Sequence, residues 1–491
     1  MKKAIVVGSG IGGLATSIRL ACQGFQVTVF EANAYPGGKL TAFSLGKYRF
    51  DAGPSLFTMP HFVSELFELA GENPTEHFAY KKKEIACQYF WEDGVQLTAY
   101  GDRNKLVNEI EKQLKVPSDT VLTYLENAQK KYERTQSLFL EQSLHKLSTY
   151  FSKDTLKGIL HYRSFEIGKS LHEVNQKHLK EPHLVQMYDR YATYNGSSPF
   201  KTPGIMTLVQ HLEQHYGTFI PYKGMEDISQ SIYQLALRKG VRFHFNTTVS
   251  KIVIENKKAK GIQVKGEEFR SDVTIASADY HHVDQFLLEK QNRQYTPKYW
   301  DKRHLAPSSL IFYLGVNKKI PKLNHHNLFF DQDFDQHAKE IYDTKVWPKN
   351  PLYYASFPSI TDSYFAPEGK EAATFLIPIA PGLEDNEAIR KKYFDIILDR
   401  LEKSTNQELR SSVLFVESFC VNDFIKDYNS YKGNAYGLAN ILTQTAFLRP
   451  KIKSKKVENL YFTGQLTVPG PGVPPSIISG KIVSEKIIKN I

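Results

Sequence analysis

Cysteine is scarce in this sequence: Cys22, Cys87 and Cys420 are the only three among 491 residues, and they lie far apart. Three isolated thiols form neither a disulfide framework nor a Cys-based zinc site, and they favour a reducing compartment. We therefore expect no metal site. Long apolar runs are also missing, because no stretch reaches the ~20 residues that a membrane-spanning helix needs. The N-terminal residues MKKAIVVGSG have no apolar core followed by a cleavage site, so we expect a cytoplasmic protein without a signal peptide.

Nucleic-acid-binding modules are absent as well, although the formal net charge is +11. The sequence shows no zinc-finger spacing, no aromatic RNA-binding strand and no basic heptad region, so we expect no nucleic-acid partner. Lysines cluster at residues 81–83, 257–260 and 451–456. These clusters are either solvated loops or patches that face an anionic membrane, where each basic residue contributes about 1 kcal/mol.

The strongest motif that is present occupies residues 3–33, KAIVVGSGIGGLATSIRLACQGFQVTVFEAN. Residues 4–7 form an apolar run typical of a buried parallel strand, and a helix is expected from about Leu14 to Gln23. A second strand is expected at residues 26–30, and it ends on Glu31. The order strand, G-x-G-x-x-G, helix, strand and acidic residue predicts a dinucleotide-binding unit.

Each part of this motif has a separate physical role. Gly8 permits a tight turn from strand to helix, Gly10 lets the backbone approach a pyrophosphate, and Gly13 lets the helix pack closely on the strand. The helix N-terminus offers free N–H groups to the phosphates. Glu31 accepts hydrogen bonds from a ribose diol, and its charge disfavours a 2′-phosphate.

Just after Glu31 come ANAYPGGKL (residues 32–40) and YRFDAGPS (residues 48–55). The turn at residues 36–39 places a second flexible backbone beside the first loop. Here the sequence resembles the flavoprotein superfamily of amine oxidases and carotenoid desaturases, which carries a G-G-R-like turn. Lys39 stands where that superfamily usually has Arg, and a Lys neutralises a phosphate without the bidentate fork of Arg. The resemblance implies that the cofactor is FAD.

The C-terminal sequence NLYFTGQLTVPGPGVPPSIISGKIVSEKI, residues 459–487, matches the segment that holds the flavin ring in this superfamily. A strand at residues 459–463 leads to Gly464, the expected close approach to the ribityl chain, and Gln465 stands where an acidic residue is common. The loop at residues 469–476 brings the N–H groups of Gly472 and Val473 to the pyrimidine edge, and Ser476 opens the final helix. Residues 240–280 are expected to form a strand, a β-meander and a return strand, in which Asp279 serves as a turn or cap residue.

The resemblance therefore implies one set of cofactor-binding residues along the whole chain. This set is Gly8, Gly10, Ile11, Gly12, Gly13, Glu31, Ala32, Gly38, Lys39, Gly53, Pro54, Ser55, Val249, Gly464, Gln465, Gly472, Val473 and Ser476.

Two further segments, residues 50–72 and 195–229, resemble the bacterial carotenoid desaturases, the phytoene desaturase-like family. Residues 91–102 and the sequence GPSLFTM favour the branch of 3,4-desaturases that act on hydroxylated acyclic or monocyclic carotenoids. The alternatives are a phytoene desaturase-type enzyme, an amine-oxidase-like flavoenzyme, and a non-catalytic escort protein that binds isoprenoids.

Desaturation in this family implies hydride transfer to the flavin and loss of a proton from the neighbouring carbon. The candidate proton acceptor is Asp154, with Lys157 one helical turn away. Asp189 and Arg190 are alternatives, water or the flavin itself is another, and Asp154 is otherwise a member of a surface ion pair. An electron acceptor, oxygen or a quinone, must reoxidise the flavin.

We expect an α/β fold in which a Rossmann-like FAD-binding domain is interrupted by a discontinuous α+β substrate domain. The FAD-binding domain is expected from residues 1–75, 220–290 and 445–491. The substrate domain is expected from residues 76–219, mainly helical, and from residues 291–444, mainly β-sheet. The segment 136–165 is a candidate interfacial helix pair, so we expect a peripheral association with the inner membrane, with packing inside the substrate domain as the alternative.

Overall fold

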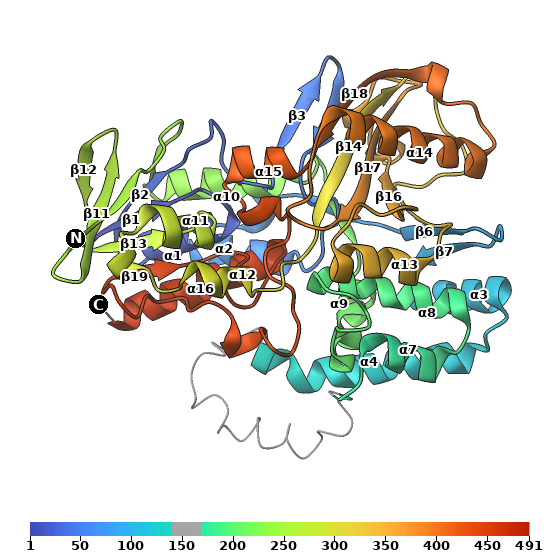
Figure 1. The fold of residues 1–491 in the computed structure, drawn as a ribbon, viewed down its shortest axis with the longest axis horizontal. Helices are drawn as coiled ribbons and strands as arrows, with labels where there is room; N and C mark the ends of the chain where they lie inside the picture. The colour runs from blue at the N-terminus through green and yellow to red at the C-terminus, as the bar shows by residue number, and fades with distance from the viewer. Residues whose placement is uncertain (140–165, 167, 491) are drawn as a thin grey trace.

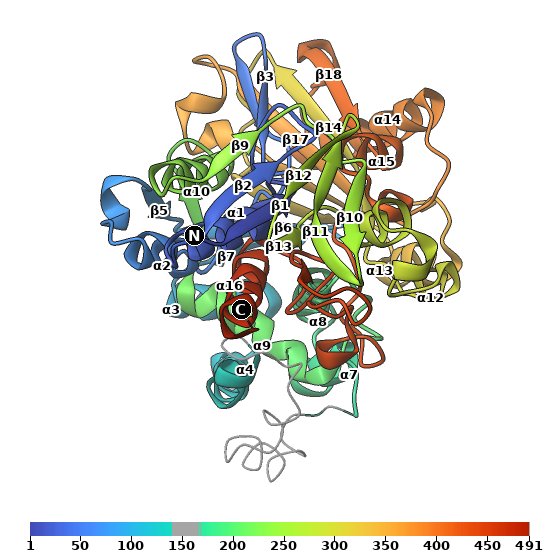
Figure 2. The same cartoon turned by 90° about the vertical axis from the view of Figure 1, so that its left-hand side faces the viewer.

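A computed structural model describes residues 1–139, 166 and 168–490. No helix within these ranges is long and apolar enough to cross a membrane. Two large sheets dominate the fold and lie at opposite ends of the long axis (Figure 1). The N-terminus and the C-terminal end of the last helix lie near each other in both views (Figures 1 and 2).

The first sheet has five parallel strands and contains the predicted dinucleotide-binding strands. Val6 pairs with Ile275 on one side and with Val29 on the other. The strand order is β19-β13-β1-β2-β9, so segments from the start, the middle and the end of the chain share this sheet. The strands are β1 (Lys3–Val7), β2 (Gln26–Phe30), β9 (Arg242–His244), β13 (Val273–Ala276) and β19 (Leu460–Phe462).

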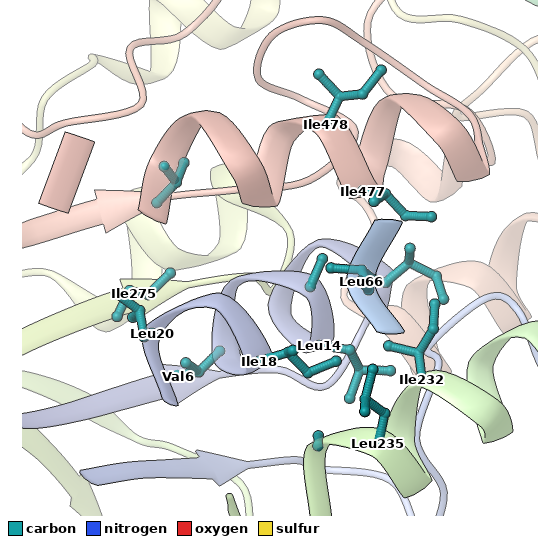
Figure 3. Close-up of a cluster of buried hydrophobic side chains, with 14 of the residues drawn as sticks. Val6, Leu14, Ile18, Leu20, Leu66, Ile232, Leu235, Ile275, Ile477 and Ile478 are labelled. Carbon is teal, nitrogen blue, oxygen red and sulfur yellow. The ribbon is translucent and has the colours of Figure 1, made fainter. Parts of the chain in front are cut away.

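One face of this sheet is covered by helices that come from both ends of the chain. Leu14 and Ile18 of the first helix lie between Ile477 of the last helix and Ile232 of a third (Figure 3). The first and last helices touch closely, because a Cβ added at Gly480 would lie 2.8 Å from the Cβ of Ala15. These helices are α1 (Ile11–Ala21), α2 (His61–Leu69), α10 (Glu226–Arg238) and α16 (Val473–Asn490).

The other face of the five-stranded sheet carries the predicted β-meander. Ile252 and Ile262 of the meander belong to the same buried cluster as Ile5 and Phe30 of the sheet. The expectation of a strand, a meander and a return strand over residues 240–280 is confirmed. The meander strands are β10 (Lys251–Glu255), β11 (Lys258–Val264) and β12 (Glu267–Arg270).

The second sheet has seven strands in the order β18-β14-β17-β16-β15-β6-β7. All pairs are antiparallel except the pair of β15 with β6. Residues 76–219, expected to be mainly helical, thus contribute two strands, because the run IACQYFW buries nearly all of its side chains between the sheet's two covering layers. The strands are β6 (Ile85–Trp91), β7 (Gln96–Tyr100), β14 (Ser308–Val316), β15 (His326–Phe330), β16 (Tyr353–Ser356), β17 (Glu371–Ile379) and β18 (Val413–Phe419).

Helices cover both faces of the second sheet. One group lies beside β6 and β7, below the sheet in Figure 1. It comprises α3 (Arg103–Leu114), α4 (Ser118–Phe139), α7 (Leu171–Leu179), α8 (Pro182–Asp189), the short 3₁₀ helix η3 (Arg190–Asn195) and α9 (Leu208–Tyr216). On the opposite face, α14 (Glu387–Thr405) packs through Ile397 and Leu401 against the sheet. Other short helices include α11 (Tyr280–His282), α13 (Phe334–Lys339) and α15 (Val421–Tyr428).

Candidate active site

A cavity of about 860 Å³ extends from the carboxyl ends of β1, β2 and β13 to the second sheet and to helices α8 and α9. Ligand sites in open parallel sheets lie at such carboxyl ends. All the expected cofactor-binding residues line this cavity except Gly13. The structure thus brings together side chains that are more than 400 positions apart, such as Glu31 and Val473.

The glycines after β1 have two different roles: some permit close packing of the helix, and others line the cavity. A Cβ at Gly13 would lie 2.4 Å from the carbonyl oxygen of Gly8 and 2.8 Å from the hydroxyl of Ser277, so Gly13 permits close packing and does not face the cavity. Gly8 has a φ of +97°, and its Cβ would lie 2.9 Å from the nitrogen of Ala278. At Gly10 the nearest atom would be 3.9 Å away, so this backbone is open to an approaching group.

Glu31 lies directly after β2 and is only 7% exposed. One carboxylate oxygen accepts hydrogen bonds from the backbone nitrogen of Ser9, at 2.7 Å, and from its hydroxyl, at 2.8 Å. The other oxygen accepts from the backbone nitrogen of Asn33 at 2.9 Å. These bonds fix the carboxylate at the cavity wall and leave lone pairs for the hydroxyls of a ribose.

The second glycine turn lies beside the first, as the sequence predicted. Gly37 forms a bridge with Gly10 and donates its N–H to the carbonyl of Ser9 at 2.9 Å. Lys39 is buried, and its ammonium donates to the carbonyls of Asn434 (3.2 Å) and Ala435 (3.1 Å). Burial lowers the pKa of Lys39 to about 8. Lys39 therefore ties the cofactor side of the cavity to the segment that leads toward the last strand.

The C-terminal loop closes the cavity from the opposite side. Gly464 and Gly472 have φ values of +104° and +114°, which suit glycine. The last helix begins at Val473 and not at Ser476 as expected, because Pro474 and Pro475 fit the first turn of a helix, where no N–H partner is needed. The two prolines have no N–H, so Val473, which lines the cavity, is a candidate donor at this helix end.

Two residues that shape the cavity had no clear signal in the sequence. Asp279 caps α11 by accepting from the nitrogen of His282 at 3.1 Å, as the sequence suggested, but it also lines the cavity. Its second carboxylate oxygen is buried without a partner among the described residues, and burial raises the pKa of Asp279 to about 6. Arg449 is fully buried and donates to the carbonyls of Leu438 (2.8 Å) and Gln465 (3.2 Å), which joins two segments that frame the cavity.

The part of the cavity away from the five-stranded sheet is mainly apolar and aromatic. Most of this wall comes from α9, β15, β16 and the segments around α13 and Tyr436. Its members include Tyr132, Ile205, Met206, Leu208, Val209, Leu212, Leu328, Phe330, Ile341, Tyr342, Leu352, Tyr354 and Tyr436. Such a chamber suits a long hydrocarbon, since apolar burial contributes about 25 cal/mol per Å².

Of the expected proton acceptors, Asp154 and its neighbour Lys157 lie outside the described residues. Asp189 lines the cavity, but both of its carboxylate oxygens are engaged: one accepts from Asn175 at 2.8 Å, and the other lies 2.6 Å from Nδ1 of His172. Its neighbour Arg190 pairs with Glu213 in the same wall.

The cradle formed by the two glycine turns, Glu31 and the Val473 helix end fits a dinucleotide such as FAD. Open backbone at Gly10 faces the cavity, and the fixed carboxylate of Glu31 lines it. The oxygen of Asp279 that has no partner among the described residues is buried in the same wall. The cavity continues past this cradle into the apolar chamber, so a cofactor and a hydrocarbon can lie in contact.

Comparisons with known proteins agree with this geometry. The family model for flavin containing amine oxidoreductases matches residues 11–488. A 1-hydroxycarotenoid 3,4-desaturase of Flavobacterium sp. is 38% identical over 99% of both chains. A carotenoid 3,4-desaturase of Haloarcula japonica is 32% identical over 99% of this chain and 98% of its own.

Solved structures show the same fold at low sequence identity. An oxidoreductase from Methanosarcina mazei superposes with a TM-score of 0.65 at 17% identity, covering 98% of this chain and 100% of its own. A putrescine oxidase bound to putrescine superposes with a TM-score of 0.63 at 11% identity, covering 99% of each chain. The chain therefore belongs to the flavin containing amine oxidoreductase family, and its full-length relatives include carotenoid desaturases.

Proposed function

We propose that the chain is an FAD-dependent carotenoid desaturase, with a hydroxylated acyclic or monocyclic carotenoid as its substrate and the 3,4-bond as its target. The observation that carries this proposal is the continuity of one cavity, which joins a dinucleotide cradle to an apolar chamber. The full-length similarity to two 3,4-desaturases supports the choice of substrate and bond.

When bound, FAD would supply a two-electron acceptor for a hydride from one substrate carbon, and the neighbouring carbon would lose a proton. The residues of this chain bind and orient the two partners. Glu31 and the glycine turns would hold the dinucleotide, and the N–H of Val473 would donate to it at the opposite end of the cavity; all of these residues except Gly13 line the cavity. The aromatic wall excludes water and fixes one carbon pair of the polyene, so that catalysis depends mainly on positioning.

The proposal includes the division of the chain into domains. Residues 1–75, 220–290 and 445–491 build the FAD-binding domain, and residues 76–219 and 291–444 build the substrate domain. The shared five-stranded sheet supports the first group, and the seven-stranded sheet, which combines β6 and β7 with β14 to β18, supports the second.

The test uses purified protein reconstituted with FAD. We expect an oxidised-flavin absorption spectrum and, on adding a 1-hydroxycarotenoid in liposomes, a red shift of the pigment from the added conjugated double bond. Supplying either oxygen or a quinone identifies the acceptor that sustains turnover. Failure to bind FAD would favour the escort alternative, while FAD binding with amine oxidation and an unchanged pigment would favour an amine oxidase.

The substrate is lipid-soluble, so we also propose that the protein works at the cytoplasmic face of the inner membrane. Leu442, Phe447 and Leu448 are 52%, 48% and 41% exposed, and Leu442 lines the cavity. The lysines of residues 451–456 follow this apolar group along the chain. We expect flotation with anionic liposomes at low salt and weaker flotation at high salt. Equal flotation with neutral and with anionic liposomes would contradict a role for the lysines in membrane binding.

A further inference from the structure

A buried ion pair lies in the mainly apolar part of the cavity. Arg190, at the start of η3, donates from Nη2 to both carboxylate oxygens of Glu213 on α9, at 3.0 and 3.3 Å. The two side chains are only 11% and 7% exposed, and both residues line the cavity. Removing two charges from water is costly, and a pure hydrocarbon substrate would make no hydrogen bond with them. The pair therefore suggests that the substrate carries a polar group.

Aromatic side chains hold this pair in one geometry. The guanidinium lies 4.4 Å from the ring centroid of Tyr191, and its Nε donates to the hydroxyl of Tyr89. The hydroxyl of Tyr194 donates to Oε2 of Glu213 at 2.8 Å. Since both charged groups are fixed from the protein side, their remaining hydrogen-bonding positions have a defined direction.

Two of those positions are unused. Nη1 of Arg190 has no hydrogen-bond partner among the described residues, and this atom keeps some accessible surface. Oε1 of Glu213 accepts from Arg190 alone. The wall therefore offers one donor and one acceptor side by side. This differs from neighbouring Asp189, whose two oxygens are both engaged.

We propose that Arg190 and Glu213 bind the hydroxyl group at the end of the carotenoid and thereby determine which carotenoid is accepted. A hydroxyl both accepts and donates hydrogen bonds, so it satisfies Nη1 and Oε1 together, whereas a carbonyl satisfies only the donor. A carotenoid without the hydroxyl leaves the ion pair in place but gives Nη1 and the remaining lone pair of Oε1 no partner. This inference rests on the proposed desaturase function and adds the group that the enzyme recognises.

The experiment compares two acyclic carotenoids that differ only in the 1-hydroxyl, offered together to the FAD-loaded protein. The wild type is expected to favour the hydroxylated carotenoid in kcat/KM by about tenfold or more, since the other carotenoid leaves a buried pair unsatisfied. The double variant Arg190→Met/Glu213→Leu removes both charges together, so no unpaired charge remains. Its preference is expected to fall toward one, with most of the loss in turnover of the hydroxylated carotenoid.

The matched control is Arg400→Met/Asp331→Leu, which removes a second partly buried ion pair, an Arg–Asp pair that does not line the cavity. Its preference for the hydroxylated carotenoid should equal that of the wild type, and the flavin spectrum reports folding in every variant.

Two results would overturn the inference: an unchanged preference in the Arg190/Glu213 variant, or no preference in the wild type. If the wild type desaturates neither carotenoid, the desaturase proposal itself fails. Equal Kd values for the two carotenoids, from quenching of protein fluorescence, would then overturn the end-group inference as well.

Discussion

Gly13 belongs to the glycine motif but does not line the cavity. It therefore affects the cofactor site only through the close packing of its helix on the strand. We expect Gly13→Ala to lower the thermal midpoint and the FAD content of the purified protein. The added methyl group would lie 2.4 Å from the carbonyl of Gly8, and overpacking of this kind costs about 1–3 kcal/mol. Gly168→Ala is the control, since nothing lies within 4 Å of its Cβ position. Equal effects of the two changes would contradict the packing role.

Asp279 gives a prediction that depends on pH. Its pKa is raised by burial to about 6 from a usual value near 4, so the folded state binds more protons than the unfolded state between these two values. Stability therefore falls as the pH rises through this window, and the cost is fully present above the folded pKa.

We expect Asp279→Asn to be more stable than the wild type at pH 7.5, by on the order of 1–3 kcal/mol, and to show little difference at pH 4. The amide keeps the oxygen that caps α11, so the change removes the charge and little else. Thermal midpoints of both proteins without FAD at the two pH values provide the measurement. A stability gain that is the same at both values would show that the buried charge is not its cause.

At the scale of elements, the contact of α1 with α16 decides whether the two ends of the cavity stay aligned. Gly480→Ala would favour the helix itself by about 1 kcal/mol. Its methyl group, however, would lie 2.8 Å from Ala15 and 2.9 Å from the carbonyl oxygen of Gly12. We expect the clash to exceed the helix gain, so that FAD binds more weakly in a titration and the thermal midpoint falls.

Glu485→Ala on the exposed side of α16 is the control for this prediction. It changes helix propensity without touching α1, so FAD affinity should equal that of the wild type. Tighter FAD binding by Gly480→Ala would contradict the prediction, because it would mean that α1 and α16 can move apart without loss of the cofactor site.

The local pattern of the sequence predicts the elements where one chain segment carries its own signal. Strands β1 and β2 and the glycine turns follow from apolar runs and glycine spacing, and the resemblance to a flavoprotein family adds Gly464 and Val473. Strands β6 and β7 were missed although they form a local hairpin around Asp93 and Gly94, a typical turn pair. The pairing of β6 with β15, some 240 positions later, leaves no local pattern.

Arg190 was named from the sequence only as an alternative to Asp154, and Glu213 and Arg449 were not singled out. The partners of these three residues are fixed only by the assembled fold.

At the scale of the whole molecule, the last helix is a structural part of the first sheet's core. Ile477, Ile482 and Val483 are buried in the same cluster as Val6 and Leu14. We expect a chain that stops after Gly472 to lose FAD binding and to be cut rapidly by proteases, because α16 covers α1. A chain that stops after Ile488, which removes only the end of the helix, should retain its flavin spectrum. FAD binding by the shorter chain would contradict a shared site.

The order of strands in the five-stranded sheet has a consequence for folding during synthesis. Strand β1 leaves the ribosome early, but its sheet and its helical cover are incomplete until β19 and α16 emerge. At about 5–20 residues per second, this delay lasts roughly 25–90 s. During that time the apolar face of the nascent N-terminal unit stays uncovered, so chaperones have an interval in which to bind it, and we expect FAD to bind only after α16 has emerged.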